Sequence, residues 1–178
     1  GRSAEASELN ALALGNDASA SGDSALALGD AAVASKTNAL AVGDSAQATG
    51  INAAALGNAS EASGDSAMAL GVQAVSSGEN AVAVGRDSEA SAEDSFAFGR
   101  GARASGEGAL AAGRNSAATG KNSVGLGNNA AALDSNATAV GNNAFALESN
   151  STAVGNGARS QAVDSLALGS NALSSGTS

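Results

Sequence analysis

The side chains that could do chemistry in this chain are carboxylates, arginines and hydroxyls, and two of these sets recur at one spacing. Three arginines and three glutamates each stand 14 residues apart: Arg86, Arg100, Arg114 and Glu79, Glu93, Glu107. The chain has no His and no Cys, so a Ser–His pair, a Cys–His pair and a zinc site of those ligands are excluded. Neighbouring carboxylates such as Glu93 and Asp94 are interpreted as solvated turn charges. We therefore expect no enzyme activity, no cofactor and no metal ion.

Composition argues against an ordinary globular core. Aromatic residues are 2% of the chain, glycine occurs 24 times, and Trp, Tyr and Pro are absent. The net charge of −9 disfavours binding to nucleic acid or to an anionic membrane surface, because the field of the protein repels phosphate. No apolar stretch approaches the ~18 residues of a membrane span. Because no signal peptide and no initiating Met are recognised, we expect a piece of a longer protein.

The elements that position the charged residues come from an internal repeat. Glycine recurs every 14 residues from Gly1 to Gly169 without insertion or deletion, which is typical of a solenoid. We number the repeat from Asn10 as position one to Asp23 as position fourteen. Ala or Ser then occupies positions two, nine and eleven, and Ala occupies position four except at Gly125. Aliphatic residues prefer positions three and five, and position ten varies freely.

Small residues alternate with larger or variable ones along the repeat, and alternation with period two indicates strands rather than helices. Each repeat is predicted to hold two strands of about five residues, joined by short turns in which glycine supplies a positive φ. Stacked repeats then form an all-β parallel β-roll, or solenoid, of twelve 14-residue coils, with neighbouring strands about 4.8 Å apart.

The side-chain pattern also predicts which residues face outward. Position ten carries charges such as Glu61 and Arg103, so it faces solvent, and the small residues at positions nine, eleven, two and four face into a thin roll. Positions three and five then point outward as an apolar stripe. Because a stripe of this size is unfavourable on a soluble monomer, we expect another copy of the chain to cover it. The alternative, with Leu and Val pointing inward and an alanine face outward, stays open.

The residues predicted at this interface between copies all stand at positions three and five. They are Leu12, Leu14, Leu26, Leu28, Leu40, Val42, Leu56, Met68, Leu70, Val82, Val84, Phe96, Phe98, Leu110, Val124, Leu126, Val140, Val154, Leu166 and Leu168. Ala112 leaves a gap in the stripe, which we expect to be a weak point.

The hexapeptides NALALG, NALAVG, NAVAVG, NSVGLG, NATAVG and DSLALG, each followed by two residues and then a small one, resemble the NSVAIG-type repeats of YadA-like heads in trimeric autotransporter adhesins. The resemblance covers essentially the whole chain, so residues 1–178 are expected to be a single head repeat domain, a fragment of a longer passenger. It implies a left-handed β-roll, a homotrimer, and display on the outer surface of a Gram-negative bacterium. Membrane attachment is expected only through the family's C-terminal anchor, which this sequence lacks.

The resemblance further implies adhesion, as part of virulence, to host cells or to matrix proteins such as collagen, fibronectin or laminin. Exposed positions seven, eight and ten are the expected contact columns, and repetition of a weak contact multiplies it. The alternative is a structural spacer that projects other adhesive modules. An ice-binding solenoid is disfavoured because threonine is too sparse.

The arrangement of the arginine and glutamate sets has two interpretations. They stand at positions seven and fourteen, in turns at opposite edges of the roll. In a trimer, one edge of a chain could meet the other edge of its neighbour, giving Arg–Glu pairs between chains. The alternative is two separate solvated ladders, in which each charge pair contributes little.

Overall fold

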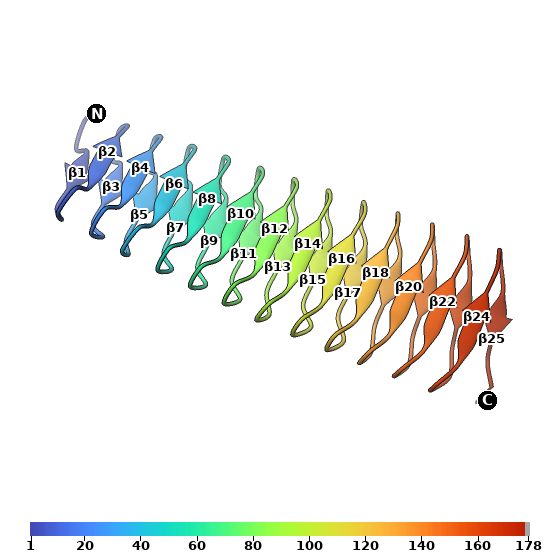
Figure 1. The fold of residues 1–178 in the computed structure, drawn as a ribbon. Helices are drawn as coiled ribbons and strands as arrows, with labels where there is room; N and C mark the ends of the chain where they lie inside the picture. The colour runs from blue at the N-terminus through green and yellow to red at the C-terminus, as the bar shows by residue number, and fades with distance from the viewer. Residues whose placement is uncertain (177–178) are drawn as a thin grey trace. The chain divides into compact units, whose positions relative to one another are not determined.

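The computed structural model describes residues 1–176 and confirms the predicted fold class. The chain is an all-β parallel β-solenoid of about 12 coils. It divides into two compact units, Gly1–Ser88 and Glu89–Ser178, and each is described by itself. In both units every coil contributes one two-residue strand and one three-residue strand (Figure 1). We call the sheets that these strands form the short-strand sheet and the long-strand sheet.

In unit 1 each strand pairs in parallel with the equivalent strand one coil away. The short-strand sheet contains β1 (Glu5–Ala6), β3 (Ser19–Ala20), β5 (Val33–Ala34), β7 (Gln47–Ala48), β9 (Glu61–Ala62) and β11 (Val75–Ser76). The long-strand sheet contains β2 (Leu12–Leu14), β4 (Leu26–Leu28), β6 (Leu40–Val42), β8 (Ala54–Leu56), β10 (Met68–Leu70) and β12 (Val82–Val84).

Unit 2 repeats the arrangement in the same register. Its short-strand sheet contains β13 (Glu89–Ala90), β15 (Arg103–Ala104), β17 (Ala117–Ala118), β19 (Ala131–Ala132), β21 (Phe145–Ala146), β23 (Arg159–Ser160) and β25 (Leu173–Ser174). Its long-strand sheet contains β14 (Phe96–Phe98), β16 (Leu110–Ala112), β18 (Val124–Leu126), β20 (Thr138–Val140), β22 (Thr152–Val154) and β24 (Leu166–Leu168). Residues 1–176 contain no helix that is long and apolar enough to span a membrane.

The expectation of two strands of about five residues is wrong, because the turns take more of each coil than the alternation suggests. After β4, the chain turns back through a hydrogen bond from Ala32 N–H to the Gly29 carbonyl at 3.3 Å. After β5 it turns again through a bond from Ala39 N–H to the Lys36 carbonyl at 3.0 Å. These reversals leave only two or three extended residues on each side.

The prediction that glycine supplies the positive φ is right for the turns that follow the long strands and, in general, wrong for the turns that follow the short strands. At position six, Gly57 has a φ of 140°, and a Cβ placed there would lie 2.4 Å from the Gly71 carbonyl oxygen. In the other turn the positive φ falls on position one, for example Asn38 at 57°. Asparagine tolerates this left-handed conformation because its short polar side chain forms local hydrogen bonds.

The interior is built from methyl groups. Ala25, Ala27, Ala32 and Ala34 line one coil and are at most 1% exposed, and the largest fully buried side chains of the described residues are serines. This burial confirms the predicted orientation and rejects the inward-leucine alternative. Between the coils, backbone hydrogen bonds such as Leu26 N–H to the Ala39 carbonyl (2.9 Å) satisfy the buried polar groups.

Because the interior is thin, we expect a valine substitution to affect stability differently at two neighbouring residues of β20. Ala139 is fully buried, so Ala139→Val adds two methyl groups where no space exists and lowers the free energy of unfolding by about 1–3 kcal/mol. Thr138→Val introduces the same residue one position earlier, on the outward face, and is expected to change stability by less than about 0.5 kcal/mol. Urea unfolding measures both. Equal losses in the two variants would contradict the assigned orientation.

Candidate self-association face

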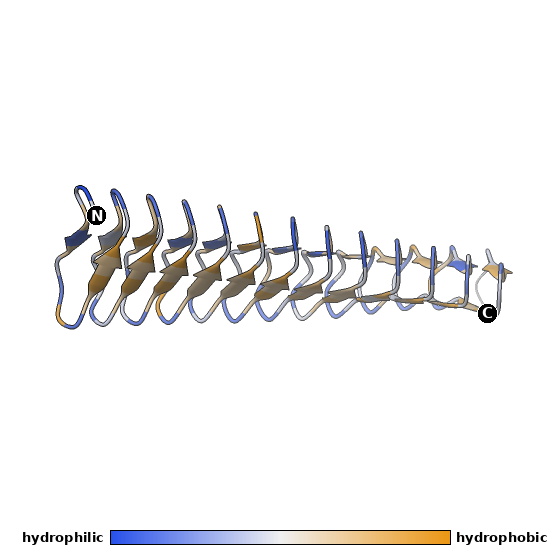
Figure 2. Ribbon diagram, turned by 90° about the horizontal axis from the view of Figure 1, so that it is seen from above, coloured by the Kyte–Doolittle hydropathy of each residue, from blue (hydrophilic) through white to orange (hydrophobic). Residues whose placement is uncertain are grey.

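The predicted interface residues all point away from the methyl-lined interior. In every long strand after β2 the middle residue is buried, and the first and third residues remain half-buried or exposed; in β2, at the first coil, the middle residue is half-buried. Figure 2 shows the long strands in hydrophobic colours along each unit. Because successive side chains of a strand alternate between faces, burying the middle alanine forces both flanking side chains outward. We call this outward surface, positions three and five of the coils, the apolar stripe.

The structure places each predicted interface residue on a long strand. They are Leu12 and Leu14 in β2; Leu26 and Leu28 in β4; Leu40 and Val42 in β6; Leu56 in β8; Met68 and Leu70 in β10; Val82 and Val84 in β12; Phe96 and Phe98 in β14; Leu110 in β16; Val124 and Leu126 in β18; Val140 in β20; Val154 in β22; and Leu166 and Leu168 in β24.

The strand register stacks these side chains into two continuous columns within each unit. Leu26 pairs with Leu40, and Leu28 with Val42, one coil further along. The aromatic members of unit 2 lie side by side: the Phe96 and Phe98 rings are stacked with centroids 6.4 Å apart and an interplanar angle of 5°. They remain 38% and 40% exposed, which is high for aromatic rings and leaves their outer faces in water in a single chain.

Sequence reasoning left four members of the stripe out of the predicted interface. Ala54, Ala112, Thr138 and Thr152 occupy outward positions of β8, β16, β20 and β22. They lie outside that prediction because it selects large apolar side chains, although the unbroken period alone places them on the same face. Ala112 is therefore a small residue within the stripe, flanked by Phe98 and Leu126.

Two edges flank the stripe, formed by the two series of turns at opposite ends of the coils (Figure 1). Among the described residues, the arginine and glutamate sets form no ion pair with each other within the chain, as expected for opposite edges. Arg86 Nε instead lies 3.4 Å from Asp87 Oδ2 in its own turn, and Lys121 Nζ lies 2.8 Å from Glu107 Oε1. Pairing between chains stays a prediction.

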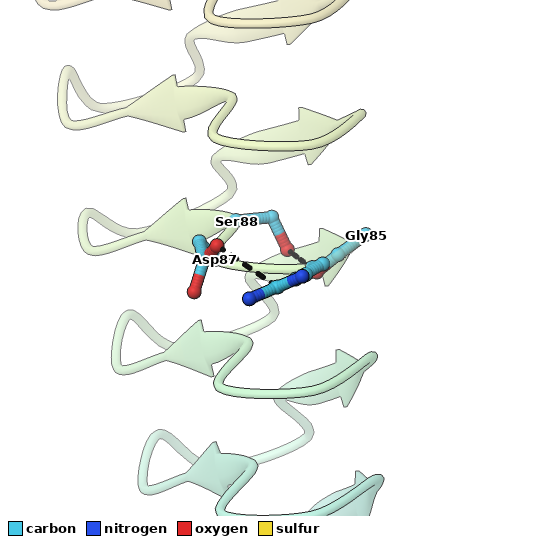
Figure 3. Close-up of polar contacts among 4 residues, drawn as sticks. Gly85, Asp87 and Ser88 are labelled. Carbon is cyan, nitrogen blue, oxygen red and sulfur yellow. Dashed lines mark hydrogen bonds and ion pairs between the residues drawn. The ribbon is translucent and has the colours of Figure 1, made fainter.

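The turn from Gly85 to Ser88 shows how an edge is built (Figure 3). The buried Ser88 hydroxyl donates to the Gly85 carbonyl at 2.8 Å, which holds the turn from inside. Asp87 takes the left-handed φ of 57° and points its carboxylate outward toward the arginine. The exposed polar side chains thus stand on a turn that the interior fixes, and such exposed ion pairs contribute little to stability.

The described residues offer little for small-molecule chemistry. No group of three or more His, Cys, Asp or Glu side chains in residues 1–176 could hold a metal ion, and no pocket opens in that part of the chain. The apolar stripe is therefore the surface that most needs a partner.

Comparison with known protein families agrees with the repeat. The family model described as YadA head domain repeat (2 copies) matches six consecutive stretches, residues 6–32, 34–60, 62–88, 90–116, 118–144 and 146–172. Each stretch spans two coils, so the matches follow the solenoid period along almost the whole chain. No curated protein matches the chain.

We expect that a charge placed on the apolar stripe disrupts self-association. In Leu40→Glu a carboxylate enters a surface that we expect another copy to cover, and an unpaired buried charge is strongly unfavourable. Sedimentation equilibrium should give a multiple of the 16.5 kDa chain mass for the parent and a clearly lower mass for the variant.

The matched control is Gln47→Glu, which adds the same charge to the same coil on the exposed short-strand sheet. It should keep the parent mass. A parent protein that sediments as a folded monomer would contradict the self-association of the stripe.

Proposed function

The chain belongs to the YadA head domain family, and from this premise we propose that three copies assemble through their apolar stripes into an adhesive module on the surface of a Gram-negative bacterium. Membership in the family implies an adhesin-type domain at the cell surface. The observation that carries the proposal is the apolar stripe itself, because its rings and aliphatic side chains stay partly in water unless another chain covers them. The number three and the left-handed winding are carried by the family resemblance.

The face left free in such a trimer presents exposed side chains at the same positions of successive coils. In the coil that contains β7, Asp44, Ser45 and Gln47 are exposed, and the same positions of the next coil are exposed at Asn58, Ala59 and Glu61. We propose that this face contacts extended host ligands, namely matrix proteins such as collagen, fibronectin or laminin, or host cell surfaces. A long ligand could touch several coils at once, and simultaneous weak contacts multiply the affinity.

We propose binding without catalysis. The chain has no His and no Cys, so general-base chemistry by imidazole and nucleophilic chemistry by thiolate lack their side chains. The net charge of −9 further supports a protein or neutral glycan partner over nucleic acid or an anionic membrane.

A second candidate function is a spacer that holds other adhesive modules away from the cell. The observation in its favour is the variation of position ten from coil to coil: Ser19, Val33, Gln47, Glu61 and Val75 stand there in successive coils of unit 1. A repeated ligand contact would favour one residue type at that position, whereas a spacer places no such demand on it.

Binding to immobilised collagen, fibronectin and laminin separates the two functions. The parent oligomer should bind at least one of them, and the Leu40→Glu variant should bind about 100-fold more weakly, because it loses the multivalent contact. Surface plasmon resonance measures both, with the Gln47→Glu oligomer as the matched control for added charge. Absence of binding above that to an uncoated surface would favour the spacer.

The proposed Arg–Glu pairing between chains has its own test. Arg100→Glu places like charges at the boundary between copies and should lower the melting temperature of the oligomer, and adding Glu93→Arg should restore it, since each exposed pair contributes about 0.2–1 kcal/mol. The experiment is run at low salt, where screening is weak. Independent, additive effects of the two substitutions would support two separate solvated ladders.

A further inference from the structure

The outward face of the short-strand sheet changes character within unit 2. In most coils position twelve carries Ser or Thr, and position thirteen most often carries Gly. In the coils of β19 and β21 both positions change together, to Leu133–Asp134 and Leu147–Glu148. Phe145 stands at position ten of the second of these coils, and its short strand pairs in register with that of the first. We call Leu133, Asp134, Phe145, Leu147 and Glu148 the apolar–acidic patch.

The apolar members of this patch stay partly in water. Leu133 is 44% exposed, and Phe145 and Leu147 are half-buried. The backbone beneath them is fixed by the coil-to-coil ladder, since Leu133 N–H donates to the Ala146 carbonyl and Leu147 N–H to the Ser160 carbonyl, both at 3.0 Å. The two leucines are thus presented one coil apart on the sheet that the apolar stripe does not use.

The carboxylates of the patch are stacked in the same way. Asp134 and Glu148 occupy one position of adjacent coils, whose strands lie about 4.8 Å apart, and like charges at neighbouring positions repel. The same spacing elsewhere in unit 2 brings opposite charges together, as when Arg103 Nη2 lies 3.2 Å from Glu89 Oε2. Neither patch carboxylate forms an ion pair within residues 1–176.

The chain has little positive charge to offer these carboxylates. From residue 122 to the end of the sequence the one Lys or Arg is Arg159. Its Cζ lies 4.9 Å from the centroid of the Phe145 ring, where it covers part of that ring and bounds the patch. The turns at the opposite edge of the same coils carry Asn128 and Asn142, so another copy that met the patch with that edge would bring no cation.

We propose that the apolar–acidic patch is a docking site for a polypeptide segment that carries both apolar and basic side chains. The apolar side chains of the partner cover Leu133, Phe145 and Leu147, and its Lys or Arg side chains bind the carboxylates of Asp134 and Glu148. One partner of this chemistry removes apolar surface from water and relieves the repulsion between the carboxylates. The inference rests on the proposed binding function and names the chemistry of a partner for it.

Synthetic peptides test the chemistry of the partner. A fluorescent peptide of leucine, lysine and serine should bind the parent protein, as measured by fluorescence anisotropy. Two control peptides, one with serine in place of leucine and one with glutamate in place of lysine, should bind about 10-fold more weakly or less. A lysine–serine peptide that bound equally well would overturn the proposal, because the net charge of −9 would then explain the attraction.

Substitutions that restore the usual residue of the repeat test the apolar part of the patch. Leu133→Ser/Leu147→Ser places at position twelve the residue that most coils carry there, so the fold should be retained, and peptide binding should weaken about 10-fold. The matched control Val33→Ser/Val75→Ser makes the same kind of change on the short-strand sheet of unit 1 and should leave the affinity unchanged. Equal losses in the two variants would overturn the assignment.

The acidic part of the patch has its own pair of variants. Asp134→Asn/Glu148→Gln removes both charges without changing side-chain size, and it should weaken peptide binding and make the affinity less dependent on salt. Asp44→Asn/Glu61→Gln removes the same number of charges from exposed positions of unit 1 and should change neither. The same effect from both variants would mean attraction by the whole chain and would overturn the proposal.

The patch and the proposed matrix ligands can fail separately. Peptide binding through the patch by a protein that binds no collagen, fibronectin or laminin would refute those ligands and keep the patch. A parent that binds matrix proteins but not the leucine–lysine peptide would refute the patch alone. The oligomer mass of Leu133→Ser/Leu147→Ser should equal that of the parent, and a lower mass would overturn the proposal by showing that another copy of the chain occupies the patch.

Discussion

The width of the interior is the constraint on which the rest of this structure depends. Two sheets of very short strands approach so closely that only a methyl or a hydroxymethyl group fits between them, as at Ala32, Ala34 and Ser60. Larger apolar residues must therefore leave the interior. Strand alternation sends most of those in strands to the outside of the long strands, and a few, such as Val33 and Val75, to the outside of the short strands. The apolar stripe follows from this exclusion. A chain that buries only small side chains gains little hydrophobic free energy by itself, and the self-association that we propose would bury the apolar stripe as well.

Polar groups of the turns maintain the stacking where side-chain packing contributes little. Asn38 Nδ2 donates to Asn52 Oδ1 at 2.9 Å, and Asn136 does the same to Asn150 at 3.1 Å. These residues also take the left-handed conformation that each turn requires. One residue type thus serves both the turn within a coil and the hydrogen bond to the next coil. This dual role explains why Asn recurs at position one while the strands contain almost none.

The fold and the outward face could be predicted from the sequence because both follow from residue size and period. Glycine at a constant spacing fixed the register, and the charges at Glu61 and Arg103 identified the outer face of the short strands. The strand lengths could not be predicted, since alternation continues into the turns and only the backbone angles end a strand. Two ion pairs were missed although the period contains them. Glu107 binds Lys121 and Glu89 binds Arg103, in each case opposite charges fourteen residues apart, at the same position of adjacent coils.

The coil-to-coil hydrogen bonds also limit how such a chain can change its length during evolution. Each coil of a unit offers its successor the same donors and acceptors, as when Gly29 N–H bonds to the Leu14 carbonyl and Gly43 N–H to the Leu28 carbonyl, both at 2.8 Å. Loss or duplication of a whole coil would join equivalent surfaces and leave the rest of the unit as it was. Loss of a single residue would place a leucine where only alanine fits and would turn glycine positions into side-chain positions. Genetic variation in length should therefore survive only in whole repeats, by exchange between repeats of the gene.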